Sequence, residues 1–342
     1  MKLKSNRLLL LIASFTVVLL IIVFYYLFIG SSLRIEESVS FKIYPNESVD
    51  KVLTELKKSG EIKNMKRLTF FLDKLGYEEP VADGNYKIVP GMSDFKLARI
   101  IKGGIQTPVK VTFNNVRTVD QLAGRLSKQL LADSLSLLEC FKDTAWMDRA
   151  GFTPETYMCV FLPNTYEAWW NATPEKVLAL FKREYDNFWS ETHLNNAKKI
   201  GLTPVEVSTL ASIVEEETNK GDEMPKVAGL YMNRLHMDMP LQADPTVKFA
   251  VGNFSLKRIM KGHTMINSPY NTYKNTGLPP GPIRIPSIKA IEAVLSYERH
   301  SYIYMCAKSD FSGYHAFATT LFQHNDNAAA YHKALNLRGI TQ

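Results

Sequence analysis

The segment LASIVEEET, Leu210 to Thr218, places an acidic side chain on the apolar face of a predicted helix. If residues 205–220 are helical, apolar residues recur there every three or four positions, which is the pattern of a buried face. Glu217 continues this stripe, whereas Glu216 points roughly to the opposite side, towards solvent. Burying a carboxylate is costly unless it is paired or protonated. A protonated carboxylic acid in a cleft is what general acid catalysis of glycosidic cleavage requires, which makes Glu217 the candidate acid.

The three consecutive glutamates, Glu215 to Glu217, also allow a plainer interpretation. A charge run at the end of a helix is often only a solvated surface, because helix ends are exposed. The predicted helix alone leaves both interpretations open, and the segments that follow it favour the chemical one.

Four later segments in the C-terminal half have constrained sequences. The longest of them, SPYNTYKNTGLPPGPI, has the composition of a stiff loop with outward hydrogen-bonding groups, which suits saccharide recognition. Alternation along a predicted strand places His315 and Phe317 on one face. Each segment has a structural alternative, since Asp244 before a proline can form a turn and His315 can be an ordinary half-buried histidine. The four segments are LQADPT (241–246), the long loop (268–283), GYHAFATT (313–320) and HND (324–326).

In this order, the motifs resemble those of the endolytic murein transglycosylases of the YceG-like family. The resemblance is carried by LASIVEEET, YMNRL, LQADPT, SPYNTY, TGLPPGPI, GYHAF and HN, and runs through most of residues 205–330. FLPNTY resembles a further family segment, in which Asn164 replaces the usual acidic residue. This replacement weakens any role for position 164.

The resemblance implies cleavage of the β-1,4 bond between N-acetylmuramic acid and N-acetylglucosamine in nascent peptidoglycan strands, without a cofactor. Glu217 matches the catalytic glutamate of the family. It would protonate the glycosidic oxygen and then deprotonate the C6 hydroxyl of muramic acid, which closes onto C1 to give a 1,6-anhydro end. One carboxylate suffices because the second nucleophile belongs to the substrate. By the same resemblance, the substrate-positioning candidates are Gln242, Asp244, Tyr270, Asn271, Tyr273, His315 and Asn325.

Two other functions remain open. A hydrolytic muramidase would use the same acid with a water nucleophile, and Asp244 would supply the second carboxylate. A non-catalytic, membrane-anchored glycan-binding scaffold would need no acid at all, and the presence of Glu217 at the matching position argues against it.

Composition limits the partners of the chain. Its 342 residues suffice for two domains, and the net charge of +7 comes without any Lys/Arg block, which excludes nucleic acid as the expected partner. The three cysteines form no CxxC or Cys/His ligand spacing, so no metal site is expected. Peptidoglycan strands are the expected partner, and peptidoglycan synthases are a further one at the level of the family.

The N-terminus carries an uncharged apolar run, Leu8 to Ile29, of the length that crosses a bilayer, about 20 residues. Lys2, Lys4 and Arg7 precede it, which by the positive-inside rule predicts a cytoplasmic N-terminus. The expected location is the inner (cytoplasmic) membrane, single-pass, with the catalytic domain periplasmic. A cleaved signal peptide is the alternative, although the run is longer than a usual signal core and lacks a convincing cleavage site.

Strand-then-helix units recur after this run, with Ser48, Ser93 and Thr118 as predicted N-caps. Residues 40–90 read strand, helix, helix, strand, an order that resembles the glycan-binding LysM fold. A structural α+β subdomain without glycan contact is the alternative. Farther along, Trp169 and Trp170 could stack on sugar rings, although paired aromatics are more often part of a core.

The predicted fold is therefore α+β, with a single N-terminal transmembrane helix, a LysM-like βααβ subdomain and a mixed α/β catalytic domain. Its parts are a cytoplasmic tail (1–7), the transmembrane helix (8–29), the LysM-like subdomain (35–108) and the YceG-like transglycosylase domain (109–342).

Overall fold

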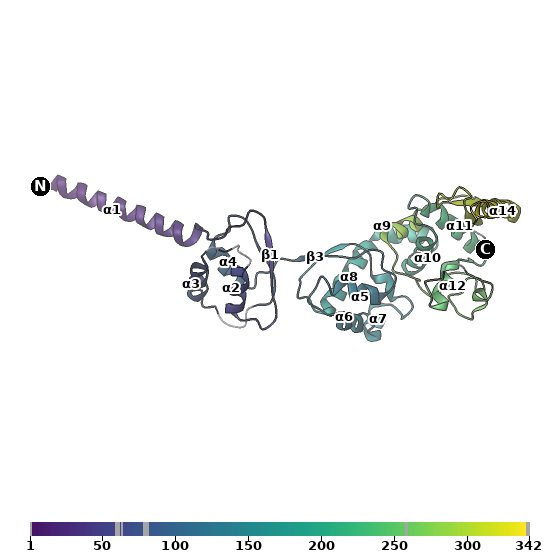
Figure 1. The fold of residues 1–342 in the computed structure, drawn as a ribbon, viewed down its shortest axis with the longest axis horizontal. Coiled ribbons are helices and arrows are strands. Elements are labelled where there is room, and N and C mark those ends of the chain that lie inside the picture. The colour runs from purple at the N-terminus through teal and green to yellow at the C-terminus, as the bar shows by residue number, and fades with distance from the viewer. Residues whose placement is uncertain (1, 59–61, 63, 78–81, 257–258, 340–342) are drawn as a thin grey trace. The chain divides into compact units, whose positions relative to one another are not determined.

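The computed structural model describes residues 2–58, 62, 64–77, 82–256 and 259–339 (Figure 1). Over these residues the chain is α+β, with helices and three two-stranded sheets. The chain divides into two compact units. The first comprises residues 1–110, 129–131 and 167–172, and the second comprises residues 111–128, 132–166 and 173–342.

The predicted transmembrane helix over residues 8–29 is wrong. Among the described residues, no helix has both the length and the apolar character needed to cross a membrane. Helix α1, Lys2–Phe24, begins within the charged N-terminal segment and ends before the apolar run does. The rest of that run, Tyr25–Ile29, is a π-helix of 5 residues, so the run is not one continuous α-helix.

The first unit contains the predicted strand, helix, helix, strand order. Its elements are β1 (Val39–Ile43), α2 (Val49–Lys58), α3 (Met65–Lys74), β2 (Gly84–Ile88) and α4 (Asp94–Lys102). Strands β1 and β2 pair antiparallel, with Phe41 opposite Tyr86. The side chains of Ile43, Leu68 and Leu97 are fully buried beneath this pair, which gives the unit its own apolar core.

A second sheet pairs β3 (Val109–Thr112) with β4 (Thr165–Ala168). The two tryptophans after β4 have different environments. Trp170 is 2% exposed and its ring meets the edge of Tyr44 at 4.9 Å, so it belongs to the core of the first unit. Trp169 is 49% exposed.

The second unit begins with helices around an aromatic core. Its early helices are α5 (Val119–Leu126), α6 (Ser134–Phe141), α7 (Thr144–Ala150), the 3-10 helix η2 (Tyr157–Val160), α8 (Pro174–Phe188) and α9 (Glu191–Lys199). Phe181 on α8 is the centre of this core, with its ring 5.4–6.2 Å from those of Phe113, Phe141, Phe161 and Tyr166.

Helix α10, Pro204–Glu217, is the central helix of the rest of the unit. A capping box of Thr203 and Glu206 starts it. Residues 207–214 are buried without interruption, and α10 packs on α9, α11, α12 and α13. A helix that is buried all round has no solvent face, so the prediction of one buried and one solvated face is wrong for α10. The helix also ends at Glu217 rather than at Lys220, because Thr218 is extended.

The elements after α10 complete the unit. They are α11 (Met224–His236), α12 (Asp244–Val251), the 3-10 helix η3 (His263–Met265), α13 (Ile288–Leu295), β5 (Tyr304–Ala307), β6 (His315–Ala318) and α14 (Leu321–Leu337). Strands β5 and β6 form the third sheet, antiparallel, with Ala307 opposite His315.

Candidate active site

A cavity of about 230 Å³ lies at the C-terminal end of α10. Its wall comes from α10, α11, the segment leading into α12, and strands β5 and β6. Glu217, the last residue of α10, contributes its carboxyl group to the cavity. The lining residues are Glu217, Leu230, Tyr231, Arg234, Leu241, Gln242, Asp244, Tyr273, Met305, Cys306, Ala307 and His315.

The Glu217 carboxyl group is oriented by Tyr231 on α11. Tyr231 Oη donates a hydrogen bond to Glu217 Oε1 at 2.9 Å. The Tyr231 side chain is buried, and this burial, together with the neighbouring Glu217, raises the pKa of its hydroxyl well above 10.0. The hydroxyl therefore keeps its proton and remains a donor to Glu217.

Burial raises the pKa of Glu217 from 4.5 to about 7. The nearby charge of Asp244 acts in the same direction, while the Tyr231 hydrogen bond and the charges of His315 and Lys248 oppose it. Desolvation is the largest of these effects. Glu217 thus gains and loses its proton near neutral pH, as a group must that serves first as an acid and then as a base.

A buried carboxylate orients His315. The backbone N–H of His315 donates to Glu223 Oε1 at 2.7 Å, and His315 Nδ1 lies 2.9 Å from Glu223 Oε2. Glu223 also accepts a hydrogen bond from Thr218 Oγ1 at 2.8 Å. These contacts tie β6 to the residue directly after Glu217. Because Nδ1 is engaged, Nε2 is the nitrogen of His315 that is left to contact a ligand.

Arg234 organises the segment before α12. Its guanidinium donates to the carbonyls of Pro240, Leu241 and Ile303, and to Gln242 Oε1 at 3.2 Å. Gln242 has a φ of 51°, in the left-handed region that residues other than glycine rarely adopt. Backbone strain of this kind concentrates at functional sites. With Oε1 occupied by Arg234, the amide nitrogen of Gln242 is the group that can donate to a ligand.

Asp244 is the second carboxylate of the cavity. It is the first residue of α12, where the helix dipole favours negative charge. Tyr273 Oη donates to Asp244 Oδ1 at 2.6 Å. Asp244 therefore has a bound donor and a favourable dipole, while Glu217 is desolvated, which gives the two carboxyl groups different environments.

A protein-family model described as the YceG-like family matches residues 41–330. The matched span covers most of the chain and includes every residue that lines the cavity. The chain belongs to the YceG-like family.

Two named relatives are similar to this YceG-like chain. It is 28% identical over 316 residues to the endolytic murein transglycosylase of Bacillus subtilis (strain 168), a match that covers 87% of this chain and 86% of that protein. It is 30% identical over 306 residues to the endolytic murein transglycosylase of Streptococcus pneumoniae serotype 2. The second match covers 79% of this chain but 54% of the relative, so the chain spans about half the length of the streptococcal protein.

A solved structure has a similar fold. The crystal structure of a YceG-like protein from Listeria monocytogenes matches with a TM-score of 0.55 and 25% sequence identity. The match covers 85% of this chain and 99% of the Listeria chain.

The cavity brings together most of the candidates named from the sequence, namely Glu217, Gln242, Asp244, Tyr273 and His315. The others lie outside its lining. The Tyr270 ring packs on Phe249, with 4.6 Å between ring centroids. Asn271 is fully buried, and its side-chain amide donates to the carbonyls of Thr264 and Ile266, so it shapes the 264–273 loop. Asn325 is exposed on α14.

Three residues of this YceG-like site were not among the candidates from the sequence. Tyr231 and Arg234 lie three positions apart on α11, and Glu223 comes just before that helix. The YMNRL segment contained the signal, because a tyrosine and an arginine at this spacing share a helix face. Arg234 is only 7% exposed, and a buried arginine needs several acceptors.

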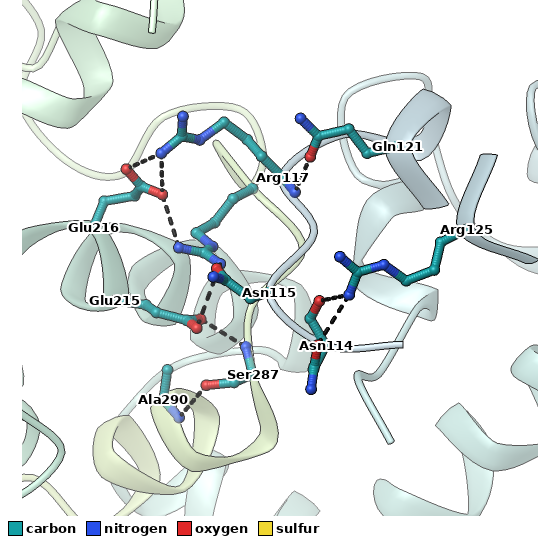
Figure 2. A network of polar contacts seen from close by, with 10 residues as sticks. Asn114, Asn115, Arg117, Gln121, Arg125, Glu215, Glu216, Ser287 and Ala290 are labelled. Carbon is teal, nitrogen blue, oxygen red and sulfur yellow. Dashed lines mark hydrogen bonds and ion pairs between the residues drawn. The ribbon is translucent and has the colours of Figure 1, made fainter. Parts of the chain in front are cut away.

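Glu216 does not face solvent, contrary to the sequence-based prediction. Both of its oxygens accept from Arg117 Nη2, at 2.7 and 2.6 Å, and Oε1 also accepts from Arg284 Nη1 at 2.8 Å. Figure 2 shows Glu215 and Glu216 side by side in this network, with Glu215 accepting from the backbone N–H of Ser287 at 2.7 Å. The side chains of both glutamates are about 15% exposed or less. Ion pairs, rather than water, therefore compensate the two carboxylates that precede Glu217.

The site offers no evident metal position. In the described parts of the chain, no three His, Cys, Asp or Glu side chains are grouped in a way that could hold a metal ion. Cys140, Cys159 and Cys306 are free thiols.

Proposed function

We propose that this chain is an endolytic murein transglycosylase that cleaves the β-1,4 bond between N-acetylmuramic acid and N-acetylglucosamine, with Glu217 as general acid and base. The observation that carries the proposal is the Glu217 carboxyl group, desolvated in a polar cavity with a pKa of about 7. The family assignment and the names of both relatives support the activity.

The reaction needs two proton transfers, and Glu217 takes part in both. Protonated Glu217 gives its proton to the glycosidic oxygen as the bond from C1 breaks, and N-acetylglucosamine leaves with a free hydroxyl. The Glu217 carboxylate then takes the proton of the muramic acid C6 hydroxyl while that oxygen bonds to C1. The products are a 1,6-anhydro end and a regenerated acid, and no water is consumed.

The surrounding groups have distinct roles in this proposal. Tyr231 holds Glu217 in place and keeps its proton exchange near neutral pH. The Gln242 amide nitrogen donates to the sugar, and His315 Nε2 donates to it or accepts from it. Asp244 lies in the same cavity, where its negative charge favours the positive charge that develops at C1.

The competing chemistry is hydrolysis, in which Asp244 would activate a water molecule. The presence of a second carboxylate in the cavity is the observation that keeps this alternative in view. Digesting purified peptidoglycan and weighing the products by mass spectrometry distinguishes the two. We expect 1,6-anhydro ends, whereas hydrolysis would give reducing ends heavier by the mass of one water. Uncleaved peptidoglycan would overturn both.

The pH dependence of kcat/KM should follow Glu217. The acid must be protonated in the free enzyme, so activity should fall as the pH rises through about 7. The Tyr231 hydrogen bond lowers the Glu217 pKa, so Tyr231→Phe should move the alkaline limb to higher pH. An alkaline limb that stays in place in Tyr231→Phe would mean that another group donates the proton.

In this proposal the two parts of the chain have different roles. Residues 109–342 carry the chemistry, and the LysM-like subdomain, residues 35–108, positions the glycan. A cavity of about 200 Å³ along β1 and α2, lined by Phe41, Lys42 and Glu55 among others, supports a binding role. Peptidoglycan lies outside the cytoplasmic membrane, so the chain would act there, beside the synthases that make nascent strands.

A further inference from the structure

A second cavity, of about 340 Å³, adjoins the Glu217 cavity. His315 lines both cavities, and Ala316 and Phe317 continue β6 along the second one. The remaining wall comes from the start of α11, the segment before β5 and the connection between β5 and β6. Whatever binds there therefore lies beside the group that reacts at Glu217.

The second cavity carries charges of both signs. Three carboxyl groups line it, those of Asp222, Glu223 and Glu298. Glu223 is engaged by His315 and Thr218. Lys226 and Lys308 supply ammonium groups. Lys226 Nζ is 3.6 Å from Glu298 Oε1, which is a loose ion pair between partly exposed side chains. Among the described residues, Lys308 forms no ion pair within 4.0 Å, although its charge acts on nearby Asp310. Its Nζ lies 5.7 Å from the centre of the Tyr314 ring. Both cations therefore remain accessible to an anionic ligand.

Aromatic side chains hold these charges in position. Tyr314 Oη donates to the Asp222 carboxylate at 2.9 and 3.2 Å. Lys226 Nζ lies 5.7 Å from the ring centre of Tyr302 and 5.5 Å from that of Phe317. Ring faces attract ammonium groups without neutralising them.

A neutral sugar would not need a cavity lined by charged side chains, because its hydroxyl and acetamido groups pair with neutral donors and acceptors. Neighbouring cations and anions suit a ligand that itself carries both carboxylates and an ammonium group. In peptidoglycan, that description fits the stem peptide on muramic acid, which contains the carboxylate of D-Glu and the side-chain amine of a diamino acid. The peptide branches from the sugar whose C1 bond breaks, so it must leave the Glu217 cavity beside the reacting sugar.

We propose that this second cavity binds the stem peptide of the muramic acid residue held at Glu217, with Lys226 and Lys308 pairing with its carboxylates. The proposal rests on the proposed transglycosylase function. It makes the enzyme prefer glycan strands that still carry their peptides over strands stripped of them.

The test compares kcat/KM on peptide-bearing glycan strands with kcat/KM on strands freed of peptides by an amidase. The wild-type protein should prefer the peptide-bearing strands. Lys308→Gln should reduce this preference roughly fivefold, which is the effect of losing one accessible ion pair, and Lys226→Gln should do the same. Lys333→Gln, which changes an exposed lysine on α14 outside both cavities, is the matched control and should keep the wild-type preference.

A direct binding measurement supplies a second readout. The probe is N-acetylmuramoyl-L-Ala-γ-D-Glu-L-Lys, titrated into the wild-type protein and into Lys308→Gln. We expect weaker binding to the variant, and weaker binding of the probe in which the D-Glu carboxylate is amidated. Equal kcat/KM on both kinds of strand, or a preference that Lys226→Gln and Lys308→Gln leave unchanged, would overturn the stem-peptide site. Failure of the wild-type protein to cleave either kind of strand would instead overturn the proposed function.

Discussion

Glu217→Gln should reduce cleavage of peptidoglycan by at least a factor of about 10² to 10⁴, the contribution of one general acid and base. The amide has nearly the size of the carboxyl group and can still accept the hydrogen bond from Tyr231. It cannot deliver a proton to the glycosidic oxygen or take one from the C6 hydroxyl. Release of anhydro-muropeptides from purified sacculi, measured by mass spectrometry, gives the rate.

Two further variants serve as comparisons for Glu217→Gln. Glu139→Gln, which changes an exposed glutamate on α6, should keep the wild-type rate. Asp244→Asn should slow the reaction less than Glu217→Gln, because Asp244 only stabilises charge in the proposed mechanism. If Asp244→Asn is inactive and Glu217→Gln is active, the assignment of Glu217 as the acid is wrong, and Asp244 supplies the proton.

Glu217→Gln should also reveal how much the ionised Glu217 carboxylate destabilises the folded state. Folding raises the Glu217 pKa from 4.5 to about 7, so ionisation disfavours the folded state. The penalty is absent below pH 4.5, grows as the pH approaches about 7, and is constant above that value. Glu217→Gln removes it, so the variant should be more stable than the wild type by up to ~3 kcal/mol in mildly alkaline buffer, with no such gain in acid. Denaturant unfolding at both pH values measures the difference and separates lost chemistry from lost structure.

The local part of the site could be predicted from the sequence. Glu217 lies seven residues after Leu210 on an apolar stripe, and helical geometry alone directs it inward. The loop and strand motifs also supplied Gln242, Asp244, Tyr273 and His315, all of which line the cavity. Glu217 needed only spacing and residue type, whereas the other four residues came from the resemblance of their motifs to those of the YceG-like family.

Contacts between distant segments could not be predicted in this way. Glu223 and His315 are 92 positions apart, and only the β5–β6 hairpin brings them within 2.9 Å. Asparagine is a residue type that can bind ligands, but the Asn271 side-chain amide donates to carbonyls of its own loop. Residue type indicates which bonds a side chain can make, whereas the tertiary fold decides its partners.

The error at Glu216 came from assuming that α10 has a solvent face. Ser208, Thr209 and Ser212 appear polar in the sequence, but all three are buried because their hydroxyls donate to carbonyls within the helix. At the N-terminus, counting apolar residues did not reveal where α1 ends, at Phe24. In both cases the residue types were identified correctly, but the burial of the helix or the place where it ends depended on its geometry.

Arg284→Met should lower the free energy of unfolding by ~3–5 kcal/mol, the usual cost of removing one partner from a buried ion pair. The Arg284 side chain is 8% exposed and lies against both Glu215 and Glu216, with Nη2 also donating to Asn115 Oδ1 at 2.8 Å. These glutamates occupy the last turn of α10, where the helix dipole already disfavours negative charge. Without Arg284, two nearly buried carboxylates lose much of their compensation at that end of the helix.

Denaturant unfolding gives the stability, and two comparisons identify its cause. Arg183→Met removes an arginine that is 64% exposed and, within the described part of the chain, pairs only with its neighbour Glu184. This change should alter stability by no more than ~0.5 kcal/mol. Adding Glu216→Gln to Arg284→Met should recover part of the loss, because the second change removes a carboxylate that the first left uncompensated. Losses that simply add would show that Arg284 and Glu216 act independently.

The ion pairs of Arg117 and Arg284 should also affect catalysis. They hold Glu215 and Glu216, and Glu217 follows these two glutamates directly. Arg117 and Arg284 hold Glu216 from two separate segments of the second unit. The last turn of α10 therefore has little freedom to shift. Arg284→Met should therefore lower kcat more than it raises KM, since it moves the acid and leaves Gln242 and His315 in place. The alkaline limb of its pH profile should shift as well, because a displaced Glu217 loses part of its burial. A variant that is less stable but has the wild-type kcat and pH profile would limit Arg284 to a role in folding.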